Sequence, residues 1–136
     1  MGEPATSRLS RFRRAIFVML ACYWAALFIG THVPAPVLPD LPRYSDKVVH
    51  FVMYAGLSYL LALYYLASRP MKLQHYLTVF VITAVYAAAD ELLQLAVHRH
   101  SSFYDGVADA LGSLTGLAAF TVTRHILERG SDRPDG

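Results

Sequence analysis

Ionisable and hydrogen-bonding side chains occur within or beside three long apolar stretches of this sequence. They form three groups along the chain: Asp46, Lys47, His50 and Tyr54; then Asp90, Glu91 and Gln94; then Arg99, Asp105 and Asp109. A charged side chain at membrane depth costs about 2.5 to 3.5 kcal/mol on insertion scales, so such residues usually have a function. Carboxylates beside an imidazole and two cations are suited to acid–base chemistry, proton transfer or the binding of a polar ligand.

The spacing within each group places its side chains on one helix face. Asp46 and His50 are four residues apart, as are Asp90 and Gln94, and residues at this spacing lie one above the other on a helix. Tyr54 continues the face of His50 one turn deeper. If the helix that carries Asp90 ends near residue 97, Asp90 lies roughly 10 Å below the membrane surface. We therefore expect all three groups to meet in the outer half of the bilayer.

The composition indicates a membrane protein. Of 136 residues, 55% are hydrophobic and 16% are charged, whereas a soluble domain carries about 25% charged residues. Four stretches approach the roughly 20 residues that a membrane-spanning helix needs. They are residues 15–30, 48–67, 77–97 and 106–123. The two middle stretches lack the polar face of a soluble surface helix, which favours an all-α integral membrane bundle of four transmembrane helices over a soluble bundle.

The basic residues predict the topology and the division of the chain. One side of a four-helix arrangement receives Arg8, Arg11, Arg13, Arg14, Arg69, Lys72, Arg124, Arg129 and Arg133, and the other receives Arg43, Lys47 and Arg99. The positive-inside rule then places both termini in the cytoplasm. We predict a basic N-terminal segment (1–14), a membrane domain (15–124) and a disordered cytoplasmic tail (125–136). The net charge of +2 is accounted for by this topology signal and implies no nucleic-acid partner.

Some of these residues have an alternative, local role. Ser45 or Asp46 could cap the second helix, and Ser102-x-x-Asp105 matches a capping box. One residue can both cap a helix and bind a ligand. The remaining acids lie beyond the first turn of any helix and need a partner, a proton or water. They are Asp90, Glu91 and Asp109.

Other residues are expected to serve packing or the membrane interface. Gly112-x-x-x-Gly116 predicts a close contact between two helices. His32 lies near a helix end, where an imidazole is tolerated at the interface. An aromatic belt at the membrane surface accounts for several further rings. These are Tyr23, Trp24, Tyr64, Tyr65, Tyr76 and Tyr104.

Acids outnumber cations in the predicted site. Lys47 and Arg99 are its fixed cations, and His50 is a third candidate; the acids are Asp46, Asp90, Glu91, Asp105 and Asp109. Some carboxyls are therefore expected to hold a proton at neutral pH, because burial and like charges disfavour the ionised form. Alternatively, a cation fills the gap. The spacing matches no metal-binding motif, so we predict no metal and no cofactor.

At these residues the sequence resembles the VanZ-like family of small multi-pass membrane proteins. The similarity lies in Asp46-Lys47-x-x-His50-x-x-x-Tyr54, in Asp90-Glu91-x-x-Gln94, and in the order of Arg99, Ser102, Asp105, Asp109 and Gly112. It covers about residues 15–124. The family often has Asn where this chain has Asp109, which adds a possible charge. The resemblance implies a protein of the bacterial cytoplasmic membrane. The namesake is linked to glycopeptide (teicoplanin) resistance, a role that is not assumed here.

Three functions are compatible with this site. The first is binding or modification of a lipid-linked or cell-wall-related ligand in an outward-facing polar cleft, where Arg99 and Lys47 meet a phosphate or carboxylate. The second is an intramembrane enzyme acting on a lipid head group, with Asp90, Glu91 or Asp109 as general acid or base and His50 as its partner. The third is a proton-coupled transporter or accessory subunit, which would need a homo-oligomer because four short helices make a poor transport path. The lipid bilayer is the expected partner in all three.

Overall fold

The computed structural model describes residues 5–32, 43–67, 69–70, 72–96 and 102–131. These residues form four helices: α1 (Ala5–His32), α2 (Arg43–Leu66), α3 (Leu73–Ala96) and α4 (Phe103–Ser131). Each helix contains a stretch that is long and apolar enough to cross a membrane. The predicted all-α bundle of four transmembrane helices is therefore confirmed.

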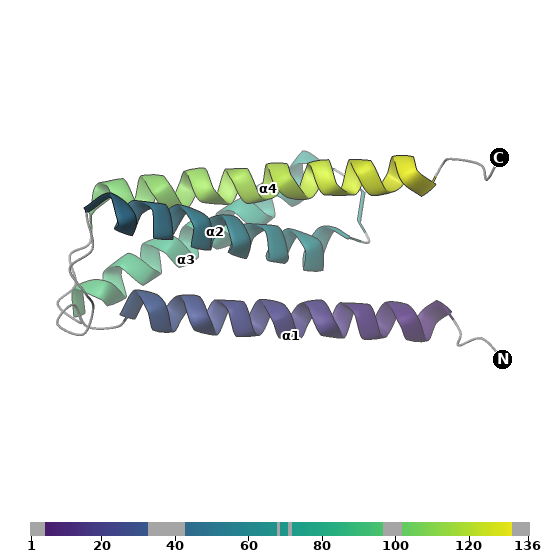
Figure 1. Cartoon of the computed structure of the whole chain (residues 1–136), viewed down its shortest axis with the longest axis horizontal. Coiled ribbons are helices and arrows are strands. Elements are labelled where there is room, and N and C mark those ends of the chain that lie inside the picture. Colours follow the sequence, from purple (N-terminus) through teal and green to yellow (C-terminus); the bar gives the residue numbers. More distant parts are fainter. Residues whose placement is uncertain (1–4, 33–42, 68, 71, 97–101, 132–136) are drawn as a thin grey trace.

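The helices alternate in direction, so both termini lie at the same end of the molecule (Figure 1). At the opposite end, the last turns of α1 and α3 lie near the first turns of α2 and α4 (Figure 1). This is the end at which the three predicted polar groups lie. The placement of the termini in the cytoplasm stays a prediction.

The first and last helices are longer than their apolar stretches. Helix α1 begins at Ala5, and α4 continues to Ser131, through part of the segment predicted as a disordered tail. Outside lipid, a helix can continue through polar residues when its own side chains support it. In α4, Arg124 Nε lies 2.8 Å from Glu128 Oε1, an i,i+4 ion pair that stabilises helix. Hydropathy therefore identified the lipid-crossing part and not the whole helix.

Helices α2 and α4 are parallel and make the most extensive contact in the bundle. Gly112 and Gly116 lie against the α2 backbone at Phe51 and Ala55, and a Cβ atom on either glycine would meet a carbonyl oxygen. The predicted close contact at this motif is confirmed, and α2 is the partner. Small residues let helices approach closely in membranes, where the hydrophobic effect gives little drive to association.

Helix α1 packs on the other side of the bundle. It contacts α2 and α3, and no close backbone approach to α4 occurs within the described residues. In Figure 1, α1 and α4 lie at opposite edges of the molecule. Tyr23 Oη donates a hydrogen bond to the Met53 carbonyl (3.0 Å), and its ring lies against Gly56. Helices α2 and α3 therefore each contact all three other helices, and α2 makes the larger contact with α4.

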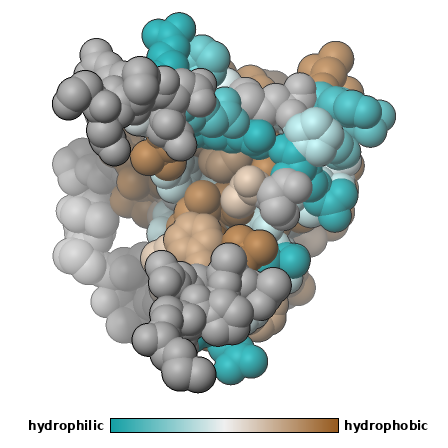
Figure 2. Space-filling view, turned by 90° about the vertical axis from the view of Figure 1, so that its right-hand side faces the viewer, coloured by the Kyte–Doolittle hydropathy of each residue, from teal (hydrophilic) through white to brown (hydrophobic). Residues whose placement is uncertain are grey.

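The outer surface of the bundle carries many apolar side chains, as a membrane protein requires. Large apolar side chains are exposed along the helices, including Phe17, Val52, Val85 and Val122. Figure 2 shows the end that carries both termini, where hydrophilic residues lie mainly around the rim and apolar surface lies between them.

At the end of α2, Arg124 Nη1 donates hydrogen bonds to carbonyl groups and so caps that helix. The acceptors are Leu66 (3.0 Å) and Arg69 (2.8 Å).

Candidate ligand-binding site

Two polar side-chain contacts join the first two turns of α2 and α4. Lys47 Nζ donates to Asp105 Oδ1 at 2.8 Å. One turn deeper, His50 Nδ1 lies 2.9 Å from Asp109 Oδ1. The Lys47 side chain is 38% exposed, whereas those of His50 and Asp109 are 3% and 1% exposed. The deeper pair is therefore removed from solvent, and losing either member would leave a buried polar group alone.

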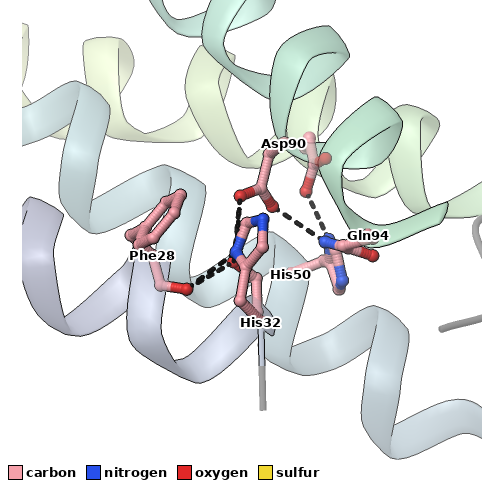
Figure 3. A network of polar contacts seen from close by, with 7 residues as sticks. Phe28, His32, His50, Asp90 and Gln94 are labelled. Atoms are coloured by element: carbon pink, nitrogen blue, oxygen red, sulfur yellow. Dashed lines mark hydrogen bonds and ion pairs between the residues drawn. The ribbon is translucent and has the colours of Figure 1, made fainter. Parts of the chain in front are cut away.

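Asp90 of α3 is held by hydrogen bonds to both of its oxygens. Thr31 Oγ1 of α1 donates to Oδ1 at 2.9 Å, and Gln94 Nε2 donates to Oδ2 at 2.8 Å. Figure 3 shows His32 between Phe28 and Asp90. His32 Nδ1 lies 3.6 Å from Asp90 Oδ1 and 2.9 Å from the Phe28 carbonyl oxygen, and the His32 ring stacks on Phe28. The predicted need of Asp90 for partners is met largely by α1.

The sequence analysis missed the contribution of α1. Thr31 was not considered, and His32 was expected only to be tolerated at the interface. Helix α1 has no acidic residue in its apolar part, so no charge drew attention to it. The sequence did carry one indication. Thr31 and His32 directly follow the first apolar stretch, at the same level as the other polar groups.

Each of the four helices also contributes one buried polar atom that lacks a hydrogen-bond partner within the described part of the chain. These atoms are His32 Nε2, Tyr54 Oη, Tyr86 Oη and Asp109 Oδ2. The Trp24 side chain faces Tyr86 Oη, but it makes no hydrogen bond of good geometry with it. Native proteins leave few buried polar atoms unsatisfied. Water or a ligand is the usual partner at such a place.

The aromatic rings place two of these atoms near the carboxylates. The Tyr54 and Tyr86 ring centroids are 6.1 Å apart, and Trp24 packs edge-on against Tyr86 at 5.1 Å. Tyr54 is fully buried, and it lies close enough to Asp109 and Asp90 for their charges to act on its hydroxyl. We name the whole set the polar layer. It consists of Thr31, His32, His50, Tyr54, Tyr86, Asp90, Gln94 and Asp109.

The other predicted site residues lie at its margin. Glu91 is partly buried, and a Cβ atom on Gly106 would lie 3.3 Å from its Oε1 atom, so Glu91 faces the start of α4. Asp46 lies in the first turn of α2, which begins at Arg43. Arg99 lies outside the described residues. The structure therefore brings described residues from three helices close together, and α1 adds Thr31 and His32.

The observed helix ends change the predictions about which residues cap α2 and α4. Since α2 begins at Arg43, Ser45 and Asp46 lie inside its first turn and not at its N-cap position. At α4, the Ser102 hydroxyl accepts a hydrogen bond from the Tyr104 amide (3.3 Å), and the Asp105 amide donates to the Ser102 carbonyl (2.8 Å). The Asp105 carboxylate is bound by Lys47. Ser102 thus caps α4, and Asp105 links two helices.

The polar layer can bind a proton or a polar group by hydrogen bonds. Asp109 Oδ1 fixes the orientation of the His50 ring, while Oδ2 remains available to accept a hydrogen bond. Among the described residues, no three His, Cys, Asp or Glu side chains are grouped so that they could hold a metal ion. Hydrogen bonding and acid–base chemistry are therefore what this arrangement offers.

The family of the chain follows from its match to known proteins. A family model described as VanZ/LLP1 matches residues 7–124. The chain belongs to the VanZ/LLP1 family. No curated protein and no solved structure matches this VanZ/LLP1 protein. Family membership and four apolar helices together make it a multi-pass membrane protein.

Proposed function

We propose that this VanZ/LLP1 protein binds the polar head group of a lipid-linked or cell-envelope ligand in the polar layer. The observation that carries the proposal is the set of four unsatisfied buried atoms, one from each helix. A bound head group would give these atoms hydrogen-bond partners that the described protein residues do not supply. Leaving them unsatisfied would cost about 1 to 3 kcal/mol each.

The position of the polar layer suits a ligand that is anchored in the membrane. It lies at the end of the bundle away from the termini, and large apolar side chains face outward beside it, such as Leu92 and Val107. Acyl chains can pack on that outer surface while the head group enters between the helices. By the positive-inside rule, the distribution of basic residues favours this end as the outer one, in keeping with the bacterial cytoplasmic membrane that the family resemblance implies.

Co-purification tests the proposal. The full chain is extracted into polymer-bounded membrane discs without detergent, and the retained lipids are identified by mass spectrometry. We expect one lipid class to be enriched over the bulk membrane and to fall about tenfold with Asp109→Asn, which corresponds to a loss of about 1.4 kcal/mol.

Thr115→Val is the matched control for that experiment. Thr115 is also on α4, but it is exposed and its hydroxyl donates only to the Leu111 carbonyl of its own helix (2.8 Å). The control should retain the lipid as the wild type does. A wild-type protein that retains the lipids of the bulk membrane in unchanged proportions would refute the proposal.

A second candidate function is acid–base catalysis on the same head group. It is favoured by the buried His50–Asp109 pair, in which Asp109 Oδ2 has no partner. A carboxylate or imidazole that contacts a ligand hydroxyl can remove its proton. Incubation with an envelope lipid extract should then yield a product of altered mass, which His50→Gln abolishes while binding persists. Unchanged lipid masses under the wild-type protein count against catalysis.

A further inference from the structure

The charge of the polar layer restricts the chemistry of its ligand. Asp90 and Asp109 lie within it, and Glu91 lies at its margin. Lys47 is the nearest lysine or arginine in the described part of the chain, and its ammonium group is bound to Asp105 at 2.8 Å. When these carboxyls are ionised, a phosphate or carboxylate entering the layer would lie among like charges in a medium of low dielectric constant, where their repulsion is weakly screened.

The unsatisfied atoms show which hydrogen bonds the ligand must make. The Phe28 carbonyl can only accept, so the 2.9 Å contact with His32 Nδ1 places the ring proton on Nδ1. In the neutral ring, Nε2 is then an acceptor. Asp109 Oδ2 is an acceptor when ionised, and the Tyr54 and Tyr86 hydroxyls can donate or accept. The layer thus presents two acceptors and two groups of both kinds.

We propose that the head group is an uncharged sugar, recognised through its hydroxyl groups. This inference rests on the proposed function and specifies its ligand class. Each sugar hydroxyl can donate to Asp109 Oδ2 or His32 Nε2 and accept from a tyrosine hydroxyl, and it brings no negative charge into the layer. The inference departs from the phosphate or carboxylate expected from Lys47 and Arg99 in the sequence; of these two cations, the structure describes Lys47, which is bound to Asp105.

Trp24 supplies a built-in probe for this binding. It is the only tryptophan in the chain, and its ring lies against Tyr86. The full chain is placed in phosphatidylcholine vesicles that contain glucosyl-diacylglycerol, phosphatidic acid or diacylglycerol, all with the same acyl chains. Binding is followed by Trp24 fluorescence and, independently, by the number of lipids retained per protein after extraction into polymer discs.

We expect saturable binding of glucosyl-diacylglycerol and none of the other two lipids. Tyr54→Phe removes a hydroxyl, and Asp109→Asn exchanges the charged acceptor Oδ2 for an NH2 donor. Each should weaken binding about tenfold, whereas Thr115→Val should leave it unchanged. Tighter binding of phosphatidic acid overturns the sugar inference but retains head-group binding. Sugar binding that neither layer variant changes also overturns the inference. An absence of binding for every lipid, by both measurements, overturns the inference and counts against the proposed function.

Discussion

The α2–α4 interface is closed by direct backbone contact, whereas α1 meets α2 and α3 largely through side chains. Gly112 and Gly116 bring α2 and α4 together, and Ser58 Oγ adds a 2.8 Å hydrogen bond to the Ser113 carbonyl. On the α1 side, Thr31 reaches Asp90, and the polar atoms of its neighbour His32 are only partly satisfied.

The α2–α4 interface and the α1 side therefore contribute differently to stability and to the proposed function. Helices in lipid associate through close packing and interhelical hydrogen bonds, and α2–α4 has both. Buried polar atoms without partners lower stability, and proteins retain such features chiefly at functional sites. The α2–α4 interface is therefore the structural frame. It also supplies Tyr54 Oη and Asp109 Oδ2 to the site, while α1 adds His32 Nε2 on the side with fewer backbone contacts. Four substitutions test this division, in order of decreasing effect.

The largest effect is expected from Gly116→Val. Its side chain would meet the α2 backbone at Ala55 and Tyr59, and backbone atoms cannot move aside as a flexible side chain can. The free energy of unfolding, measured by titration with SDS in mixed micelles, should fall by about 3 kcal/mol or more. Gly130→Val is the control, because a Cβ atom there would meet nothing within 4 Å. Equal losses at both positions would contradict the backbone contact.

Asp109→Ala should have the next largest effect, because it leaves His50 buried without its partner. We expect the free energy of unfolding to fall by about 2 kcal/mol in the same titration. Asp105→Ala breaks the equivalent pair with the half-exposed Lys47 and should cost only about 0.5 kcal/mol. If the two substitutions cost the same, burial does not distinguish the two ion pairs.

Thr31→Val should loosen the packing of α1 against α3, with a smaller loss of unfolding free energy. The substitution keeps the shape of the side chain and removes one interhelical hydrogen bond, which in membranes is worth about 0.6 kcal/mol. Trp24 should become more accessible to quenching by brominated lipid, since it lies on the same helix. Thr78→Val, whose hydroxyl bonds only to the Gln74 carbonyl of its own helix, should leave quenching unchanged. Unaltered quenching in Thr31→Val would show that this bond does not hold α1.

Tyr86→Phe should change the free energy of unfolding least, and in the opposite direction. The Trp24 side chain faces the Tyr86 hydroxyl without a hydrogen bond of good geometry, so removal of this hydroxyl in ligand-free protein should leave stability unchanged or raise it by up to about 0.5 kcal/mol. Tyr23→Phe is the same chemical change at a satisfied hydroxyl and should lower stability by about 1 kcal/mol. A comparable loss in both variants would mean that Tyr86 has a partner in the folded protein.

The helices were predictable because crossing lipid demands long apolar stretches. The ends of α1 and α4 were not, since their polar turns lie outside the apolar stretches. Spacing correctly placed His50 and Tyr54 on one face and gave Asp109 its depth. It could not tell which partner each residue meets, because sequence spacing fixes depth but not the rotation of one helix against another. The roles of Thr31 and His32 were not predicted because α1 has no acidic residue in its apolar part.

The partners that join the helices lie at a nearly constant distance along the chain. The Lys47–Asp105 pair is separated by 58 residues, and the His50–Asp109 and Thr31–Asp90 pairs by 59. At a synthesis rate of about 5 to 20 residues per second, each early member waits about 3 to 12 s for its partner. During biosynthesis, Lys47 and His50 are therefore made before Asp105 and Asp109 can bind them. Asp109 arrives late and completes the assembly.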